Sequence, residues 1–178
     1  MPVGSDQTLL IVLRGNSGSG KSTVARALRD AYGRGLAWVS QDLIRRTILW
    51  EHDRPGAVNV GLIGQVARYS LDHGYHVVLD GILKADRYES MLAALARDHA
   101  GRTHFYYLDV SFEETVQRHA TRPQAAEFTA EQMRDWYRRR DLLTAVTEHV
   151  IPQTSTIEET TTLILGQARL LSGPGVAG

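Results

Sequence analysis

The chain alternates between short runs of consecutive apolar residues and longer segments in which apolar residues recur every three or four positions. The first pattern is typical of strands buried on both faces, and the second of helices with one buried face. The apolar runs predict strands at residues 8–15, 36–42, 75–81, 103–110 and 149–153. The spaced segments predict helices at 21–33, 43–50, 60–74, 86–100, 111–122, 130–141 and 157–171.

Local signals mark where several of these helices begin and end. Gly33 follows the first predicted helix and is expected to cap its carboxyl end. Capping boxes, in which Ser or Thr precedes Glu or Gln by three residues, mark helix starts at Ser111 with Glu114, Thr129 with Gln132, and Thr156 with Glu159. A turn-rich break at 51–57 separates two helices and has no assigned role.

Strands that alternate with helices predict an α/β fold, a doubly wound parallel sheet of five strands. The pattern runs without a linker or an internal repeat, so residues 1–178 are expected to form a single domain. The segment at about 112–141 is interpreted as a helical lid on that domain.

Composition narrows the functional classes. Lys plus Arg and Asp plus Glu each number 20, and this zero net charge argues against a protein that binds duplex nucleic acid. The absence of cysteine excludes disulfides, thiol catalysis and cysteine-ligated zinc. No apolar run approaches the roughly 20 residues of a membrane span, and the amino terminus lacks signal-peptide features. A cytoplasmic protein without membrane attachment is expected, of undetermined oligomeric state.

The loop after the first predicted strand has the pattern G-x-x-x-x-G-K-[ST] of a phosphate-binding P-loop. Its glycines allow close backbone approach, and the helix that follows presents its positive dipole end to phosphate. Lys21 is expected to reach the β- and γ-phosphates, although a loop that merely joins strand to helix is the alternative. The residues predicted to bind nucleotide here are Gly15, Asn16, Ser17, Gly18, Ser19, Gly20, Lys21, Ser22 and Thr23.

Two side chains are candidates to hold Mg²⁺. The Ser22 hydroxyl occupies the P-loop position that binds the ion. Asp80 ends an apolar strand, where an acidic group commonly faces the metal. The alternative for Asp80 is a turn or helix-capping role, because Gly81 follows it.

Other P-loop classes fit poorly, since the chain has no N-K-x-D or LSGGQ string and is short for a typical AAA+ module with its helical lid domain. A kinase also needs a carboxylate that accepts a hydroxyl proton. Asp42 ends the second predicted strand, at the edge of the sheet that carries the P-loop, and Arg45 shares its helix face. Capping of the following helix is the alternative for Asp42, and Arg46 is the alternative inward-facing arginine.

The strings "GNSGSGKST" and "VSQDLIRRTI" resemble those of P-loop kinases that phosphorylate small molecules or nucleic-acid ends, such as chloramphenicol phosphotransferase, zeta-toxin kinases and polynucleotide 5′-kinase domains. The resemblance covers roughly residues 8–141. It implies that Asp42 is the general base and that Arg45 helps to hold the acceptor.

The resemblance also implies a lid that carries arginines. Arg118 and Arg122, four residues apart on one predicted helix, match its R-x-x-x-R spacing. One such arginine contacts the base or phosphates, a role expected for Arg118, and Arg122 is expected to stabilise charge on the transferring group. The run at 138–140 is interpreted as a solvated face.

These features predict an ATP- and Mg²⁺-dependent kinase that phosphorylates a hydroxyl of a nucleoside, sugar or antibiotic. A polynucleotide 5′-hydroxyl kinase and a non-catalytic nucleotide-binding module are the alternatives. The neutral net charge favours a small-molecule acceptor over a nucleic-acid partner.

Overall fold

A computed structural model describes residues 1–121 and 128–170. Five parallel strands form one sheet in the order β2-β3-β1-β4-β5, which confirms the predicted α/β fold. The strands are β1 (Leu9–Gly15), β2 (Leu36–Ser40), β3 (His76–Gly81), β4 (Arg102–Asp109) and β5 (Glu148–Pro152).

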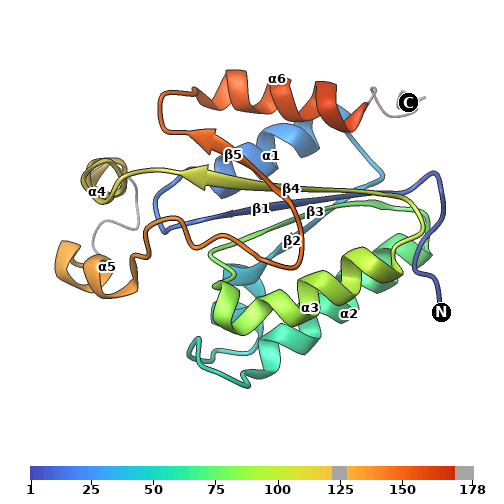
Figure 1. Cartoon of the computed structure of the whole chain (residues 1–178), viewed down its shortest axis with the longest axis horizontal. Coiled ribbons are helices and arrows are strands. Elements are labelled where there is room, and N and C mark those ends of the chain that lie inside the picture. Colours follow the sequence, from blue (N-terminus) through green and yellow to red (C-terminus); the bar gives the residue numbers. More distant parts are fainter. Residues whose placement is uncertain (122–127, 171–178) are drawn as a thin grey trace.

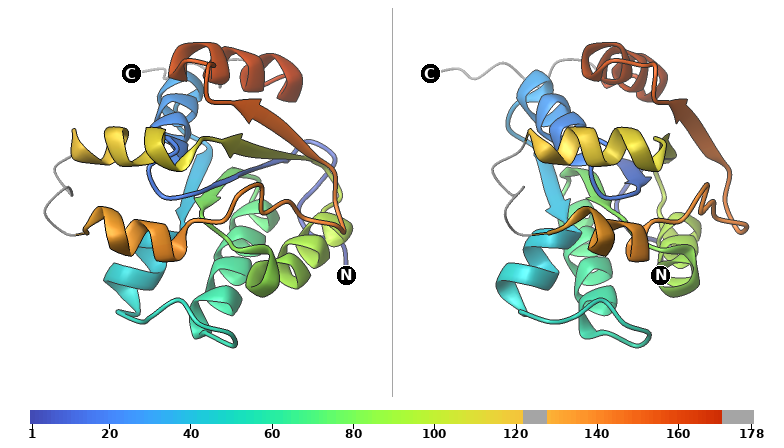
Figure 2. Two further views of the ribbon diagram at one scale, coloured as in Figure 1. Left: turned by 60° about the vertical axis from the view of Figure 1, so that its left-hand side comes forward. Right: turned by 90° about the vertical axis from the view of Figure 1, so that its left-hand side faces the viewer.

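Helices cover both faces of the sheet (Figure 1). One face carries α1 and α6, and the other carries α2 and α3. Beyond the carboxyl ends of the strands lie α4 and α5, in the segment interpreted as a lid (Figure 2). The helices are α1 (Lys21–Tyr32), the π-helix η1 (Leu43–Ile48), α2 (Val58–Asp72), α3 (Ala85–Asp98), α4 (Phe112–Ala120), α5 (Ala130–Trp136) and α6 (Ile157–Ala168).

The central strand β1 explains why its sequence is apolar without interruption. All seven of its residues are buried. Leu9, Ile11 and Leu13 pack into the core beneath α1 and α6, whereas Leu10 and Val12 pack into the core beneath α2 and α3. Because both faces are covered, β1 is held rigidly, and so is the loop that leaves its carboxyl end.

Three predicted helical features differ in the structure. The helix predicted over 130–141 ends at Trp136, because Tyr137 is extended and the next backbone groups bond to Asn16 instead. The final helix ends at Ala168 rather than 171, with Arg169 in a left-handed conformation. Ser111 caps α4, but the Glu114 carboxylate binds Arg118 and does not close the box.

The other residues predicted to cap helix ends are confirmed in that role. Gly33 caps α1, and both remaining capping boxes form completely. The segment after Asp42 is helical as predicted, but it is wound as a π-helix, a form that often occurs at functional sites. Over residues 1–121 and 128–170, no helix is long and apolar enough to cross a membrane.

Candidate nucleotide and phosphotransfer site

The P-loop joins β1 to α1 and depends on its glycines. Gly15, Gly18 and Gly20 all have positive φ angles, of 150°, 80° and 100°. A Cβ atom on Gly15 would lie 2.7 Å from the Leu108 carbonyl oxygen, and one on Gly18 would lie 2.8 Å from that of Thr115. The loop therefore needs glycine for its backbone angles and for its close approach to β4 and α4.

Lys21 is folded into this loop. It is 7% exposed, and its ammonium donates hydrogen bonds to the Asn16 carbonyl at 2.7 Å and to Ser19 Oγ at 3.3 Å. Gly20 precedes α1 without a side-chain cap, so the positive end of the helix dipole faces the loop. A buried ammonium and an uncapped helix start form a setting that suits phosphate.

Ser22 and Asp80 meet beside the loop, as their proposed metal role requires. Ser22 Oγ donates to Asp80 Oδ2 at 2.6 Å, and Trp38 Nε1 donates to Asp80 Oδ1 at 2.7 Å. Asp80 is 2% exposed, so these two donors fix a buried carboxylate. Neither oxygen caps α3, whose N-cap is Lys84, which argues against the capping alternative.

Trp38 has a role that the sequence analysis missed. It lies on β2, two residues before Ser40, which is paired with Asp80 across the β2–β3 register. Residues two apart on a strand share a face, so Trp38 lies on the face that Asp80 occupies. An indole in a strand that neighbours a candidate metal ligand was the available signal.

Asp42 and Arg45 form a second, more open pair. The Asp42 side chain is 66% exposed, and its Oδ1 lies 3.5 Å from Arg45 Nη2. Asp42 has helical backbone angles and makes no capping hydrogen bond, so the capping alternative is wrong. Its carboxylate is therefore accessible at the carboxyl edge of the sheet.

Arg45 and Arg46 extend from η1 in different directions. Arg45 is 20% exposed and also donates to the Glu51 carbonyl at 3.2 Å, while its buried Nε has no hydrogen-bond partner among the described residues. Arg46 points elsewhere, because its guanidinium lies 4.4 Å from the centre of the Phe128 ring. The structure thus brings Arg45, not Arg46, to the Asp42 side of η1.

A cavity of about 310 Å³ opens on the α1 and α6 side of the loop. Arg118 crosses its rim, because its guanidinium donates to the carbonyls of Ser19 and Gln153, each at 3.2 Å. The lining residues are Gly20, Thr23, Arg118, Thr121, Ser155, Thr156 and Ile157. This cavity adjoins the P-loop and suits the nucleoside part of a nucleotide. Arg122, the other predicted lid arginine, lies outside the described residues.

A second missed feature is a buried arginine at the end of β1. Arg14 is 0% exposed, and its Nη1 donates to both carboxylate oxygens of Glu148 at 2.9 and 2.8 Å. It also donates twice to the Leu83 carbonyl and lies 3.3 Å from Asp141. Arginine inside an otherwise apolar strand was the available signal, but its partners are far away in the sequence.

The described residues contain no group of three or more His, Asp or Glu side chains arranged to hold a metal ion. Ser22 and Asp80 are two oxygen ligands, and Mg²⁺ characteristically takes few protein ligands beside phosphate oxygens. The side chains present therefore fit Mg²⁺ that arrives with a nucleotide.

A model of the AAA domain family matches residues 10–143 of the chain. The match includes the P-loop, the Ser22–Asp80 pair and the Asp42–Arg45 pair. Among curated proteins, no sequence matches the chain significantly.

Several solved structures share this fold, among them two kinases and a chain of an RNA repair complex. The APS kinase of Mycobacterium tuberculosis, solved with AMPPNP and APS, has a TM-score of 0.66 and 17% identity, over 93% of this chain and 98% of that one. A gluconokinase from Sinorhizobium meliloti has a TM-score of 0.60 and 19% identity, over 93% and 95%. A chain of the Pnkp1/Rnl/Hen1 RNA repair complex has a TM-score of 0.52 and 20% identity, over 93% and 46%. At these identities the likeness concerns the fold.

Proposed function

The chain belongs to the AAA domain family and has the fold of P-loop kinases, and on that basis we propose that it is an ATP-dependent kinase. Its acceptor is a hydroxyl group of a small molecule. The observation that carries the proposal is the exposed Asp42 carboxylate beside Arg45, separate from the buried Ser22–Asp80 pair. A protein that only binds nucleotide has no need of a carboxylate that faces an acceptor.

Each part of the site has a role in this reaction. The P-loop backbone and Lys21 bind the phosphates, and Arg118 and the cavity at its side hold the nucleoside. Ser22 and Asp80 would hold Mg²⁺, which neutralises charge on the β- and γ-phosphates when it is bound. Trp38 keeps the Asp80 carboxylate oriented.

The acceptor oxygen forms a bond to the γ-phosphorus while the bond from that phosphorus to the β–γ bridging oxygen breaks, which releases ADP. The hydroxyl proton passes to Asp42. Arg45 holds the acceptor beside Asp42, and Arg122 is proposed to stabilise charge on the transferring group.

The acceptor class follows from charge rather than from the solved relatives. Those relatives include an APS kinase, a gluconokinase and part of an RNA repair complex, so their acceptors differ. Zero net charge supports a small molecule over a polynucleotide end, which requires a basic surface. A 5′-hydroxyl oligonucleotide is nevertheless included among the acceptors to be tested, because transfer to it would favour the alternative of a polynucleotide kinase.

The test pairs Asp42→Asn with Lys21→Ala. ADP formation is measured over nucleosides, sugars, aminoglycosides, phenicols and 5′-hydroxyl oligonucleotides, and ATP affinity is measured by calorimetry. Asp42→Asn should leave ATP affinity unchanged and slow transfer by about 10²-fold or more, as expected for loss of a general base. Lys21→Ala should weaken ATP binding itself.

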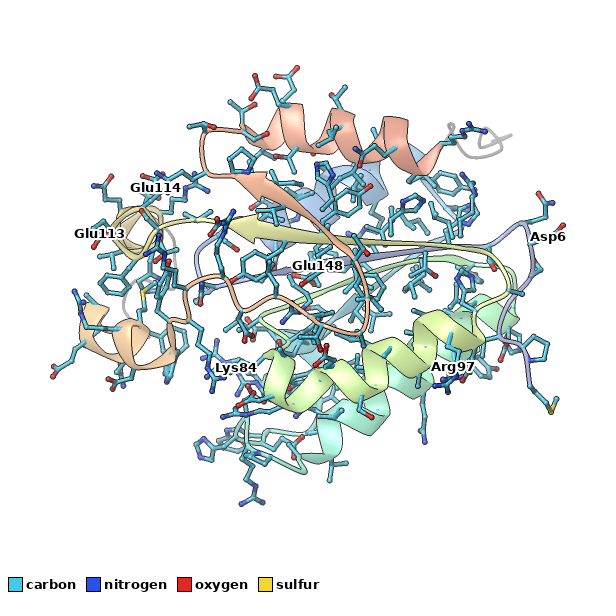
Figure 3. The ribbon with its side chains drawn as sticks, viewed as in Figure 1. Asp6, Lys84, Arg97, Glu113, Glu114 and Glu148 are labelled. Atoms are coloured by element: carbon cyan, nitrogen blue, oxygen red, sulfur yellow. The ribbon has the colours of Figure 1, made fainter. Side chains whose placement is uncertain are left out.

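The matched control is Asp6→Asn, at the far end of the molecule from the P-loop (Figure 3). It should match the wild type in both measurements. Full transfer by Asp42→Asn would remove Asp42 as the base. ATP binding without transfer to any acceptor class would favour the nucleotide-binding module.

A further inference from the structure

Lys84 is a buried cation that the proposed reaction leaves unused. It is one of two lysines in the chain, and it is 9% exposed. It follows β3 and precedes α3, where Figure 3 shows it at the amino end of α3. No hydrogen bond or ion pair joins its ammonium to another residue within 1–121 or 128–170.

The neighbouring carboxylates are already matched with arginines. Asp53 pairs with Arg87 at 3.0 Å, and Asp86 pairs with Arg138 at 3.0 Å. Asp141, which lines the same narrow gap as Lys84, binds Arg14 and the Ala85 backbone N–H. The ammonium of Lys84 is therefore left as a positive charge without a partner of its own.

This position is costly to the folded protein. Burial lowers the pKa of Lys84, and the guanidinium groups of Arg87 and Arg138 lower it further, against the opposing effect of Asp53 and Asp86. A largely buried side chain whose ammonium has no hydrogen bond among the described residues stabilises the fold less than an apolar side chain of the same length would. An anion bound at Lys84 would offset that cost.

Lys84 lies on the acceptor side of the site. The nucleoside cavity is on the α1 and α6 side of the sheet, whereas Lys84 begins α3, on the opposite face (Figure 1). Leu83, immediately before it, packs in the same core as Ile44 of η1, the helix that carries Arg45. The gap beside Lys84 is also lined by Gly15, Asn16, Trp136 and Arg138.

From this arrangement we infer that Lys84 and Arg138 form an anion subsite that holds an acidic group of the acceptor. The acceptor is then a small hydroxy compound that also carries a carboxylate, sulfate or phosphate. This inference deepens the proposed kinase function and rests on it. Lys84 supplies a point charge, and Arg138 supplies a planar fork that matches an oxyanion.

The subsite is closed in this structure, since the gap has no room for a water molecule. The Arg138 side chain is 42% exposed and pairs with Asp86, which is 47% exposed. Exposed ion pairs of this kind are worth little, so Arg138 can exchange Asp86 for an arriving anion at small cost. Movement of Arg138 and Trp136 then opens the gap.

The first experiment compares acids with their neutral counterparts as acceptors: gluconate with glucose, glycerate with glycerol, and ribose 5-phosphate with ribose. In at least one pair, the wild type should phosphorylate the acid faster than its neutral counterpart. The acidic group of that compound then identifies the oxyanion that the subsite binds. Lys84→Met should raise the KM for that acid by about thirtyfold or more, as expected when one member of a buried charge pair is removed. It should leave the neutral counterpart unaffected. Neutral compounds turned over as well as the acids would overturn the inference.

A second experiment needs no turnover, so it separates this inference from the kinase proposal. With the P-loop saturated by Mg²⁺ and AMPPNP, sulfate should raise the Tm of the wild type more than chloride does at equal ionic strength. Lys84→Met should lose the part of that difference that exceeds the general stabilisation by sulfate, an ion that is excluded from protein surfaces. The matched control Arg97→Gln, at the far end of α3 with a 72% exposed side chain, should retain it. No sulfate effect in the wild type would refute the subsite.

Stability without ligand separates a binding role from a structural one. Lys84→Met should leave the Tm of the free protein equal or raise it, because the unpartnered buried charge is gone. A fall in Tm would show that Lys84 supports the fold and would count against the inference.

Discussion

The side chain of Asn16 makes two hydrogen bonds with the backbone of Arg138, 122 residues further along the chain. Its Nδ2 donates to the Arg138 carbonyl at 2.7 Å, and its Oδ1 accepts from the Arg138 N–H at 2.9 Å. The Asn16 carbonyl also accepts from Lys21. One P-loop residue thus contacts both Lys21 and the segment that leaves α5.

Asn16→Ala should loosen that segment. Each lost hydrogen bond is worth about 1 kcal/mol, so local opening should become at least about tenfold more frequent. Hydrogen exchange followed by mass spectrometry should show faster exchange at residues 137–142. Exchange within α2 serves as the internal control and should not change. Unaltered exchange at 137–142 would show that Asn16 does not hold the segment.

Trp38→Phe should weaken the response to Mg²⁺. The substitution keeps an aromatic ring in the core but removes the donor that orients Asp80. Loss of such an orienting partner typically weakens metal affinity by about 10- to 100-fold. Calorimetric titration of ATP at graded Mg²⁺ concentrations measures the effect. Trp50→Phe, at a residue that is 91% exposed, is the control, and equal behaviour of the two variants would contradict the role of Trp38.

Arg118→Lys should impair nucleotide binding although it keeps the charge. The guanidinium of Arg118 reaches Glu114 and the carbonyls of Ser19 and Gln153 together, and a single ammonium cannot span them. ATP affinity measured by calorimetry should fall roughly tenfold, in line with one or two lost hydrogen bonds. Arg139→Lys, in the exposed run after α5, should bind ATP normally. An unchanged affinity for Arg118→Lys would remove it from the nucleotide site.

Acid should destabilise the fold before its carboxylates titrate. Burial lowers the pKa of His76, His99 and His104 below the ordinary value of 6.5. The histidines of the unfolded chain then bind protons more readily than those of the folded protein. The free energy of unfolding is therefore undiminished by these groups above pH 6.5, and it decreases as the pH falls below that value. The Tm should therefore be lower at about pH 5.5 than at about pH 7.5.

One substitution tests the cause of that loss. His104 Nε2 is buried without a hydrogen-bond partner among the described residues, so His104→Phe removes a group that resists protonation. The variant should lose less stability between the two pH values than the wild type. His52→Phe, at an exposed residue, should behave as the wild type does. Equal pH dependence in all three proteins would exclude His104 as a contributor.

Features set by neighbouring residues were predictable from the sequence. The buried apolar strand β1, the P-loop and the two complete capping boxes all depend on residues within a few positions of one another. The approach of Ser22 to Asp80 was also predictable, because the carboxyl ends of parallel strands share one edge of the sheet.

Features set by distant partners were not predictable. The helix after Thr129 ends at Trp136 because Asn16 binds the backbone of Arg138, and no local stop signal marks that point. Arg138 was interpreted as part of a solvated face, yet its backbone contacts the P-loop and its side chain pairs with Asp86. The surroundings of Lys84 likewise come from three separate segments of the chain.

The burial of Arg14 makes completion of the site a late event in the synthesis of the chain. Its partners Leu83, Asp141 and Glu148 lie 69, 127 and 134 residues away. A guanidinium cannot be sealed from water until its counter-charges have arrived, because the desolvation cost is several kcal/mol, to order of magnitude. During synthesis on the ribosome, the P-loop sequence emerges long before β5. Arg14 can be buried at the end of β1 only after β5 has paired with β4 and brought Glu148 to its guanidinium.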